Sequence, residues 1–254
     1  MMSRKAQMGI VVAFLIVLVL GGIAFYWYNS GNMQSSYSSS SNEGRIVFAM
    51  TDAAANMGSV SSVKVTVDNI KVHSNSQGWV DLSSSAKTYD LIELKNNNEL
   101  AVIADSNVES GKYDQVRFEV TKVIVVDSEG EHEAKLPSSE LKINSELNVD
   151  ENSTATATFD FIADESLHVT GSGKYILAPV IQVETRSNTE VESKGNSRVE
   201  VKGGNVDTKT KVGMDINGNV GVGLGIAANS NLDIDSSGIL KVKGNSNSGI
   251  GIGY

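Results

Sequence analysis

Residues 44–186 contain short runs in which apolar and polar side chains alternate, with turn signals between the runs. In one run, Val63, Val65 and Val67 are separated by single polar residues. Because every second side chain of a β-strand lies on the same face, this alternation predicts strands with one buried face. The frequent turn signals favour an all-β domain, a β-sandwich of the immunoglobulin-like or transthyretin-like type, over a helical fold. Residues 97–104 have the composition for a helical turn, with a strand as the alternative.

The alternation changes phase once within this region. Apolar residues resume at Ile70 and Val72, one position out of step with Val67. A regular strand cannot change parity, because its side-chain period is two. We therefore expect one extra residue in the strand, a β-bulge at Asp68 and Asn69.

The N-terminal region contains a long stretch without charge, from residue 9 to residue 28. As a helix its apolar part would extend ~28 Å at ~1.5 Å per residue, close to the thickness of the hydrocarbon core of a bilayer. Arg4 and Lys5 precede the stretch, and aromatic residues occupy 25–28 at its other end. Basic residues favour the cytoplasmic side, and aromatic residues favour the membrane interface. We therefore predict a single-pass membrane anchor over 1–28, with a cytoplasmic N-terminus and the rest of the chain outside the cytoplasm.

Two other interpretations of this segment remain open. A cleaved signal peptide also has a basic start followed by an apolar stretch. In addition, residues 5–10 are weakly similar to the processing site of archaeal pilin-like precursors, which implies a mature chain that begins at Gln7 and assembles into a surface filament. The following residues, 29–43, are rich in serine and poor in apolar side chains. Such a segment cannot bury enough surface to order itself, so we predict a flexible stalk.

The C-terminal region, residues 187–254, is rich in glycine, with 13 of the 24 glycines of the chain. Turn signals at 203–204, 217–218 and 237–238 predict a β-meander of four or five strands. Glycine alternates with apolar residues over 220–226, which leaves one face of that segment bare. This face either lies on the main domain or contacts another subunit. The alternation at 249–254 is expected to pair with its own sheet or with a neighbouring chain.

Composition excludes several classes of protein. The chain has no cysteine, which rules out disulfides, thiolate zinc sites, a cysteine nucleophile and a lipid-modified N-terminal cysteine. The formal net charge is −9, and residues 44–186 hold 12 basic and 22 acidic residues. Since binding to phosphates needs a basic surface, we expect no nucleic-acid partner. The expected partners are the lipid bilayer, through the N-terminal helix, and other surface proteins or glycans.

The motifs that carry catalysis or metal binding are incomplete. His132 and Glu133 begin a zincin-like motif, but Leu136 stands where the second histidine is required. A calcium-loop pattern at 233–238 lacks its final glutamate, because Gly244 occupies that position. We therefore expect no catalytic residue, no cofactor and no metal site. A glycan-active enzyme with paired carboxylates is kept as an alternative.

Several short motifs occur in a characteristic order within 44–186. They consist of Thr51, Asp52 and Ala53; Gly78 and Trp79; Asp90 and Leu91; Gly111, Tyr113, Gln115 and Arg117; Pro137, Ser138, Leu141 and Lys142; Phe159 and Asp160; and Gly173, Tyr175, Leu177, Pro179, Val180 and Ile181. These motifs resemble the prokaryotic family called domain of unknown function 4382. The resemblance implies an extracytoplasmic β-sandwich without an established activity. Members are often predicted lipoproteins, and here the N-terminal helix would replace the lipid.

Three charged residues at these motif positions are candidates for a site. Asp52, Asp90 and Arg117 stand beside apolar strand residues, so a buried carboxylate–guanidinium pair that joins strand ends is expected, with ligand binding as the alternative. Asn152 begins an Asn-X-Ser/Thr acceptor sequon and is a candidate for glycosylation.

Together these features predict a membrane-anchored cell-surface protein with a non-enzymatic β-sandwich domain. Its expected role is structural or adhesive, with the C-terminal region contacting other surface proteins or glycans. A pilin-like filament subunit is the main alternative.

Overall fold

The computed structural model describes residues 42–52, 57–227 and 230–242. The expected membrane helix, the pilin-like leader, most of the expected stalk and the alternation at 249–254 lie outside these residues. Within the described ranges, no helix has both the length and the apolar character that a membrane span requires. The described part is mostly β-strand arranged in several sheets, as the alternation predicted.

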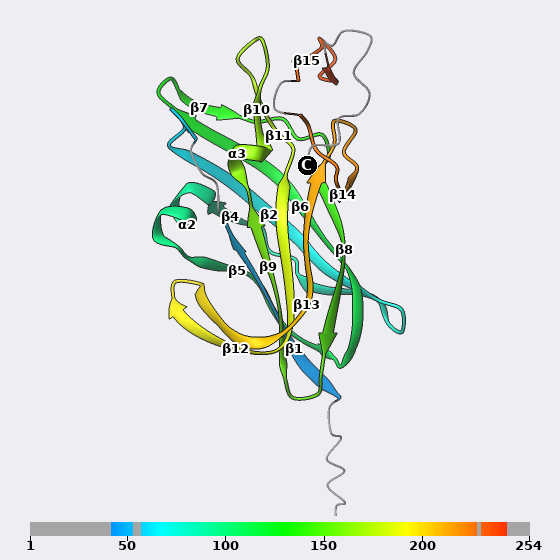
Figure 1. The fold of residues 1–254 in the computed structure, drawn as a ribbon. Coiled ribbons are helices and arrows are strands. Elements are labelled where there is room, and N and C mark those ends of the chain that lie inside the picture. Colours follow the sequence, from blue (N-terminus) through cyan, green and yellow to red (C-terminus); the bar gives the residue numbers. More distant parts are fainter. Residues whose placement is uncertain (1–41, 53–56, 228–229, 243–254) are drawn as a thin grey trace, which may run out of the picture. The chain divides into compact units, whose positions relative to one another are not determined.

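The first sheet, called sheet I, has six strands in the order β12-β9-β1-β5-β13-β14 (Figure 1). Strand β1 runs parallel to β9 and antiparallel to β5. Strand β12 also pairs with β13, so the path through the first five strands closes on itself. The strands are β1 (Glu43–Thr51), β5 (Leu100–Glu109), β9 (Thr154–Phe161), β12 (Val180–Gly195), β13 (Arg198–Met214) and β14 (Val220–Val222).

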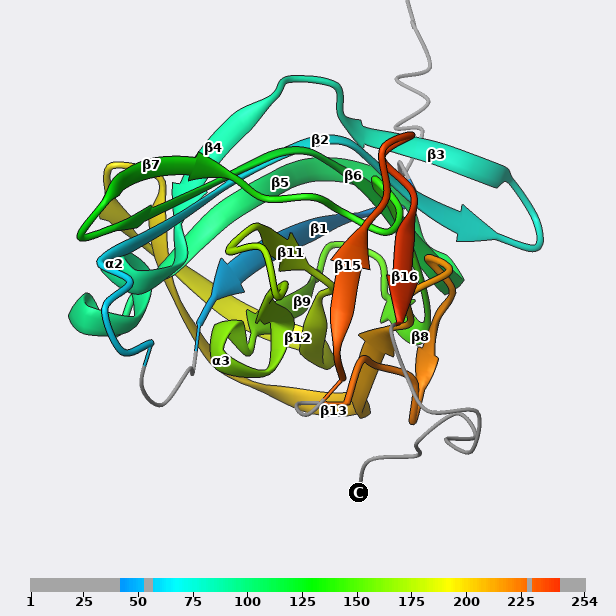
Figure 2. The same ribbon diagram turned by 90° about the horizontal axis from the view of Figure 1, so that it is seen from above.

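The second sheet, called sheet II, is antiparallel and follows the order β3-β2-β6-β7. Strand β4 also pairs with β2, and β8 also pairs with β6. In Figure 2, β2 and β6 of this sheet lie above β9 and β12 of sheet I. The strands are β2 (Ser62–Ser74), β3 (Gly78–Ser83), β4 (Lys87–Asp90), β6 (Gly111–Asp127), β7 (Gly130–Glu133) and β8 (Glu140–Val149).

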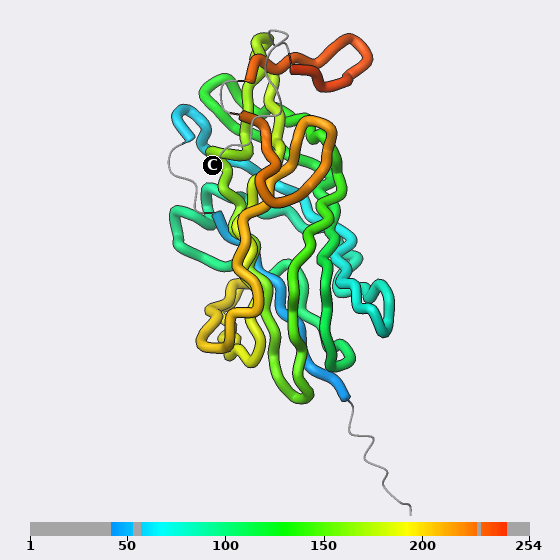
Figure 3. Tube along the Cα trace, turned by 45° about the vertical axis from the view of Figure 1, so that its right-hand side comes forward, coloured from blue at the N-terminus to red at the C-terminus, as the bar shows by residue number. Residues whose placement is uncertain are grey.

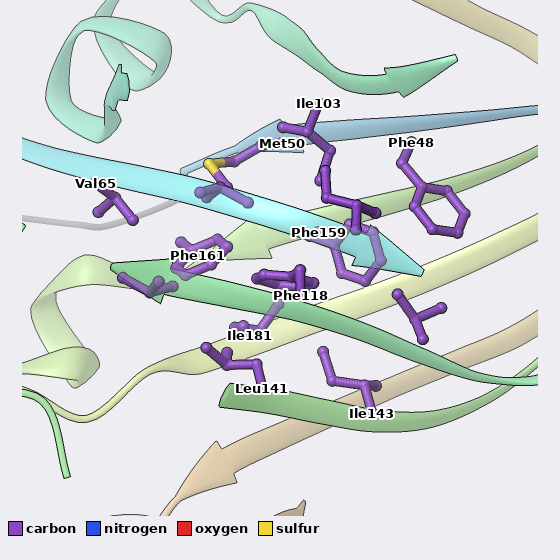
Figure 4. Close-up of a cluster of buried hydrophobic side chains, with 14 of the residues drawn as sticks. Phe48, Met50, Val65, Ile103, Phe118, Leu141, Ile143, Phe159, Phe161 and Ile181 are labelled. Atoms are coloured by element: carbon purple, nitrogen blue, oxygen red, sulfur yellow. The ribbon is translucent and has the colours of Figure 1, made fainter. Parts of the chain in front are cut away.

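An aromatic cluster forms the centre of the core between the two sheets (Figure 4). The ring of Phe159 on β9 meets Phe48 at 5.4 Å and Phe118 at 5.3 Å, both in edge-on geometry. Phe118 and Phe161 also approach each other, at 6.3 Å. Full burial of one such side chain contributes about 1.5–3 kcal/mol. Since Phe118 belongs to sheet II and the others to sheet I, this cluster holds the sheets together.

The edge of sheet II at β8 is bonded to sheet I by side chains. Thr185 donates to the carbonyl oxygen of Glu146 at 2.5 Å, and the Glu146 amide donates to Thr208 at 3.0 Å. The amide of Asn148 donates to the Asp207 carboxylate at 3.0 Å. These contacts occupy backbone groups that an open edge would offer to another strand.

The phase change on β2 corresponds to a bulge. Its pairing with β6 shifts between Asp68 and Lys71, and Asn69 takes a φ of 47°. Asparagine tolerates the left-handed region better than most residues. The predicted β-bulge is therefore confirmed.

Residues 97–104 are mainly strand, the alternative to a helical turn there, and the helix lies before them. The helix is α2 (Leu91–Asn97), and β5 begins at Leu100. Asp90 caps this helix by accepting hydrogen bonds from the amides of Ile92 and Glu93. Asn98 then ends it in the left-handed conformation, with a φ of 52°.

The expected boundary between residues 186 and 187 lies inside a strand. Strand β12 continues across it and forms a long hairpin with β13 (Figure 3). The hairpin turns at Asn196 and Ser197, which both have positive φ, and not at the predicted 203–204. Gly203 and Gly204 instead lie within β13, where both take positive φ, and a side chain at Gly204 would collide with the carbonyl oxygen of Ser187 on β12. The prediction of a turn at 203–204 was therefore wrong.

The other two predicted turns are present. The turn at 217–218 joins β13 to β14, and the turn at 237–238 joins β15 (Leu232–Ile234) to β16 (Leu240–Val242). Strands β15 and β16 form a separate two-stranded sheet. On the predicted glycine face of 220–226, a side chain at Gly221 would contact Leu224, whereas side chains at 223 and 225 would meet no other described residue. Three short elements complete the described part: α3 (Ala163–Ser166), β10 (Leu167–Val169) and β11 (Tyr175–Leu177).

Candidate functional site

The outer face of sheet II carries two parallel rows of polar and aromatic side chains across β3, β2, β6 and β8. Residues that are opposite each other on neighbouring strands point to the same face of a sheet. Together the two rows form what we call the Trp79 face. The Trp79 row consists of Trp79, His73, Gln115 and Asn144. The Arg117 row consists of Asp81, Lys71, Arg117 and Lys142.

A second bulge explains why this face contains Gln115 and Arg117. Tyr113 is buried in the core, and its hydroxyl donates to the carbonyl oxygen of Glu109 at 2.8 Å. Strict alternation from Tyr113 would direct Gln115 and Arg117 inward as well. The pairing of β6 with β8 shifts between Tyr113 and Gln115, where Asp114 alone lies opposite two residues of β8, and β6 changes parity at this irregularity. Gln115 and Arg117 consequently point outward.

Trp79 is a large aromatic side chain that stays accessible, with 38% of its surface exposed. The guanidinium carbon of Arg117 lies 4.3 Å from the centre of its ring, in cation–π geometry. The ring of His73 approaches from β2, with centroids 5.1 Å apart. The two neighbours hold the indole in one orientation, so the Trp79 face presents an ordered aromatic surface.

Hydrogen bonds and ion pairs link the remaining side chains of this face. His73 Nδ1 lies 2.7 Å from a carboxylate oxygen of Asp114. The amide nitrogen of Gln115 lies 2.5 Å from the side-chain oxygen of Asn144. In the Arg117 row, Lys71 pairs with Asp81 at 2.8 Å, and Arg117 pairs with Glu140 at 3.3 Å. Beside these contacts is an open depression of about 460 Å³, lined by His73, Trp79, Asp114, Gln115, Lys142 and Asn144.

The structure does not join Arg117 to the carboxylates expected beside it. Asp90 lies opposite Lys64 on β2, whereas Arg117 lies opposite Lys71 on the same strand. About seven residues of extended chain, ~23 Å, separate those positions. Arg117 pairs instead with Glu140 of β8. The expected carboxylate–guanidinium pair is therefore replaced by a contact within the Trp79 face.

Asp90 and Asp52 have local structural roles. Besides capping α2, Asp90 accepts a hydrogen bond from the Ser62 hydroxyl at 2.5 Å, which ties the helix to the start of β2. Asp52 follows β1, is 4% exposed, and accepts from the amide of Ala163 at 3.1 Å. Asn152 lies exposed in the turn between β8 and β9, where its glycosylation stays a prediction.

A second polar cluster lies where β6, β7 and β11 meet. One carboxylate oxygen of Asp127 accepts from the Tyr175 hydroxyl at 2.6 Å, and the other lies 3.0 Å from His132 Nε2. The hydrogen bond from Tyr175 is the main cause that lowers the pKa of Asp127 to about 2. The same bond raises the pKa of Tyr175 to about 12. This Asp127 cluster fixes the β6–β7 turn to β11.

A depression of about 820 Å³ lies between the α3–β10 segment and the β13–β14 region. His168 lines it, and burial lowers the pKa of this histidine. A neutral imidazole is therefore expected there at neutral pH. Within the described ranges, no three His, Asp or Glu residues are grouped as a metal site requires.

Sequence reasoning identified only Arg117 of the Trp79 face as a candidate. Trp79 and Gln115 belong to the quoted motifs, which was the available signal for them. His73 and Asn144 carry no such signal, because only strand pairing brings them to this face.

The comparisons with known proteins agree with the motif resemblance. No curated protein and no solved structure matches the chain. The family model described as "Domain of unknown function (DUF4382)" matches residues 43–179, more than half of the chain, and this range includes both rows of the Trp79 face. The protein therefore belongs to the DUF4382 family.

Proposed function

We propose that this protein is a non-enzymatic, membrane-anchored cell-surface protein whose β-sandwich domain binds a ligand on the Trp79 face. The observation that carries the proposal is the exposed Trp79, oriented by Arg117 within a set of polar side chains. Tryptophan and arginine are the residue types that most often dominate binding energy at interfaces. An ordered indole that stays accessible is suited to release ordered water when a ligand covers it.

The placement at the cell surface rests on the N-terminal sequence. The uncharged stretch at 9–28 follows Arg4 and Lys5 and is followed by the serine-rich segment 29–43. In this proposal the helix spans the membrane once and the stalk holds the domain outside the cytoplasm. The sandwich architecture is supported by the shared aromatic core of sheets I and II. The ligand-binding surface is placed on sheet II and not on the C-terminal region.

Protease accessibility on intact cells tests the placement. We expect added protease to degrade the domain of the full-length chain while a cytoplasmic marker stays intact. Protection of residues 44–254 on intact cells, with degradation after lysis, would contradict the proposed orientation.

Ligand binding is tested by comparing cells that display the wild-type chain with cells that display Trp79→Ala. We expect the substitution to abolish retention of the cells on a surface coated with envelope material from the same cells. Val222→Ala is the matched control, because Val222 is also an exposed apolar residue but lies on β14, outside both rows of the Trp79 face. Equal retention of all three strains would overturn the proposed binding role of the Trp79 face.

A further inference from the structure

We infer that the ligand of the Trp79 face is an uncharged polysaccharide, with a sugar ring stacked on Trp79. This inference rests on the proposed function of the face as a binding surface. It adds the chemical class of the ligand, which follows from the aromatic surface, the hydrogen-bonding groups, the charge and the shape of the face.

The aromatic surface suits a sugar ring. The apolar C–H bonds of a pyranose lie on its two faces, and the π-face of an aromatic ring carries partial negative charge that attracts them. Trp79 offers this surface with 38% exposure, and Arg117 and His73 restrict its movement. An aromatic platform that is already oriented costs little entropy when the ligand binds.

The side chains around the depression can satisfy sugar hydroxyl groups, which both donate and accept hydrogen bonds. Asp114 supplies carboxylate oxygens, Asn144 supplies an amide, and Lys142 supplies an ammonium group. All three side chains are exposed. Binding sites for small molecules usually combine an apolar or aromatic surface with a few polar groups.

Charge compensation on this face favours an uncharged ligand. Lys71 is paired with Asp81, and Arg117 is paired with Glu140. Lys142 and Asp114 both line the depression, so the face with Glu140 holds three cationic side chains and three carboxylates. An acidic polymer would have to compete with these carboxylates, and the formal charge of −9 repels a polyanion at longer range. The same repulsion disfavours a nucleic acid.

The shape of the site favours a chain over a compact ligand. The two rows extend over four neighbouring strands, β3, β2, β6 and β8. At about 4.8 Å between strands, this is a width of roughly 15 Å. The depression beside Trp79 is open, so a polymer can continue beyond it in both directions along the rows.

Affinity electrophoresis of the full-length chain tests the inference. The protein is solubilised in a detergent without a sugar headgroup, since such a headgroup would compete for the site. The gels contain dextran, galactomannan, mixed-linkage β-glucan, fully methyl-esterified polygalacturonate or free polygalacturonate. The last two polymers share one backbone and differ in charge, which makes them a matched pair.

We expect at least one uncharged polymer to retard the protein, with a retardation that added NaCl does not weaken. Trp79→Ala should lower the affinity about tenfold, the loss of one aromatic stacking contact. Trp79→Phe retains an aromatic ring and should lose less, and Asn144→Ala removes an exposed hydrogen-bonding group without touching the core. Lys209→Gln on β13 is the control for an unrelated surface change and should bind like the wild type.

Three results would overturn the inference. In the first, only free polygalacturonate retards the protein, and added NaCl weakens the retardation. The ligand would then be an acidic glycan, and the proposed binding function would stand. The second is retardation by no polymer while Trp79-dependent cell retention persists, which would point to a protein ligand. The third is Trp79-dependent binding of a single-stranded oligonucleotide. If both retardation and Trp79-dependent retention are absent, the proposed function fails together with the inference.

Discussion

The Asp127 cluster and the Trp79 face each contain a histidine, an aromatic ring and an aspartate. In the Asp127 cluster, a histidine and an aromatic ring lie 5.6 Å apart and share one carboxylate. On the Trp79 face, a histidine lies 5.1 Å from an aromatic ring and contacts Asp114.

The two regions differ in exposure. Tyr175 is 9% exposed and its hydroxyl donates to Asp127, whereas Trp79 is 38% exposed. Asp127 and Tyr175 are mostly buried and bond each other, so their polar groups stabilise the fold. A similar cluster at the surface retains apolar area that a ligand can cover. Exposure, and not residue type, therefore separates the structural cluster from the proposed binding face.

Removal of the Phe118 side chain should lower the unfolding free energy more than a substitution in either region, because both regions depend on the same core. Phe118 lies on β6, the strand that carries Arg117 at one point and Asp127 at its end. Phe118→Ala deletes a fully buried ring between the sheets and should cost about 3–5 kcal/mol of unfolding free energy. Denaturant titration measures this loss. A loss below about 1 kcal/mol would show that the core does not join the two sheets as described.

Tyr175→Phe should weaken the Asp127 cluster and leave the Trp79 face unchanged. It removes only the hydroxyl that donates to Asp127, so Tm should fall by about 2–4 °C, the shift expected for one hydrogen bond in a domain of this size. Ligand binding by the Trp79 face should stay unchanged. Calorimetry on the variant and the wild type gives the comparison, and an unchanged Tm would mean that the Asp127 cluster is not a structural tie.

The pH dependence of stability should also report on the Asp127 cluster. The pKa of Asp127 is lowered from 3.8 to about 2, so its contribution is complete above pH 4 and disappears as pH falls toward 2. The pKa of Tyr175 is raised from 10 to about 12, so its contribution is complete below pH 10 and disappears as pH rises toward 12. Tm measured across these windows should be less pH-dependent in Tyr175→Phe than in the wild type. Parallel profiles would contradict this assignment.

The smallest effect on stability is expected from Asp114→Asn. His73 and Asp114 are both partly exposed, with 30% and 47% of their side chains accessible. An exposed contact of this kind contributes on the order of 0.5 kcal/mol, so Tm should fall by less than about 2 °C, which is less than for Tyr175→Phe. A larger decrease in Tm would mean that this pair supports the fold as the Asp127 cluster does, and the contrast between the regions would then fail.

Sequence patterns predicted local features well. The alternation around Val65 identified a strand, and the phase change at 68–69 identified its bulge, because both depend only on neighbouring residues. The turn at 203–204 was predicted wrongly, since two glycines resemble a hairpin turn but lie within β13, where Gly204 allows the close approach of Ser187 on β12. At 97–104 the strand alternative is correct from Leu100 onward, and the helix lies just before it, after the local N-cap that Asp90 makes with the amides of Ile92 and Glu93.

The sequence by itself determined that the chain forms strands, where several turns lie and that cysteine chemistry is absent. The tertiary structure alone decided which polar residues meet. Arg117 reaches Trp79 and Glu140, and not Asp90, because the register of β2, β3, β6 and β8 sets its neighbours. The faces of β6 reverse where Asp114 lies opposite two residues of β8, and pairing register is a non-local property that no run of adjacent residues specifies.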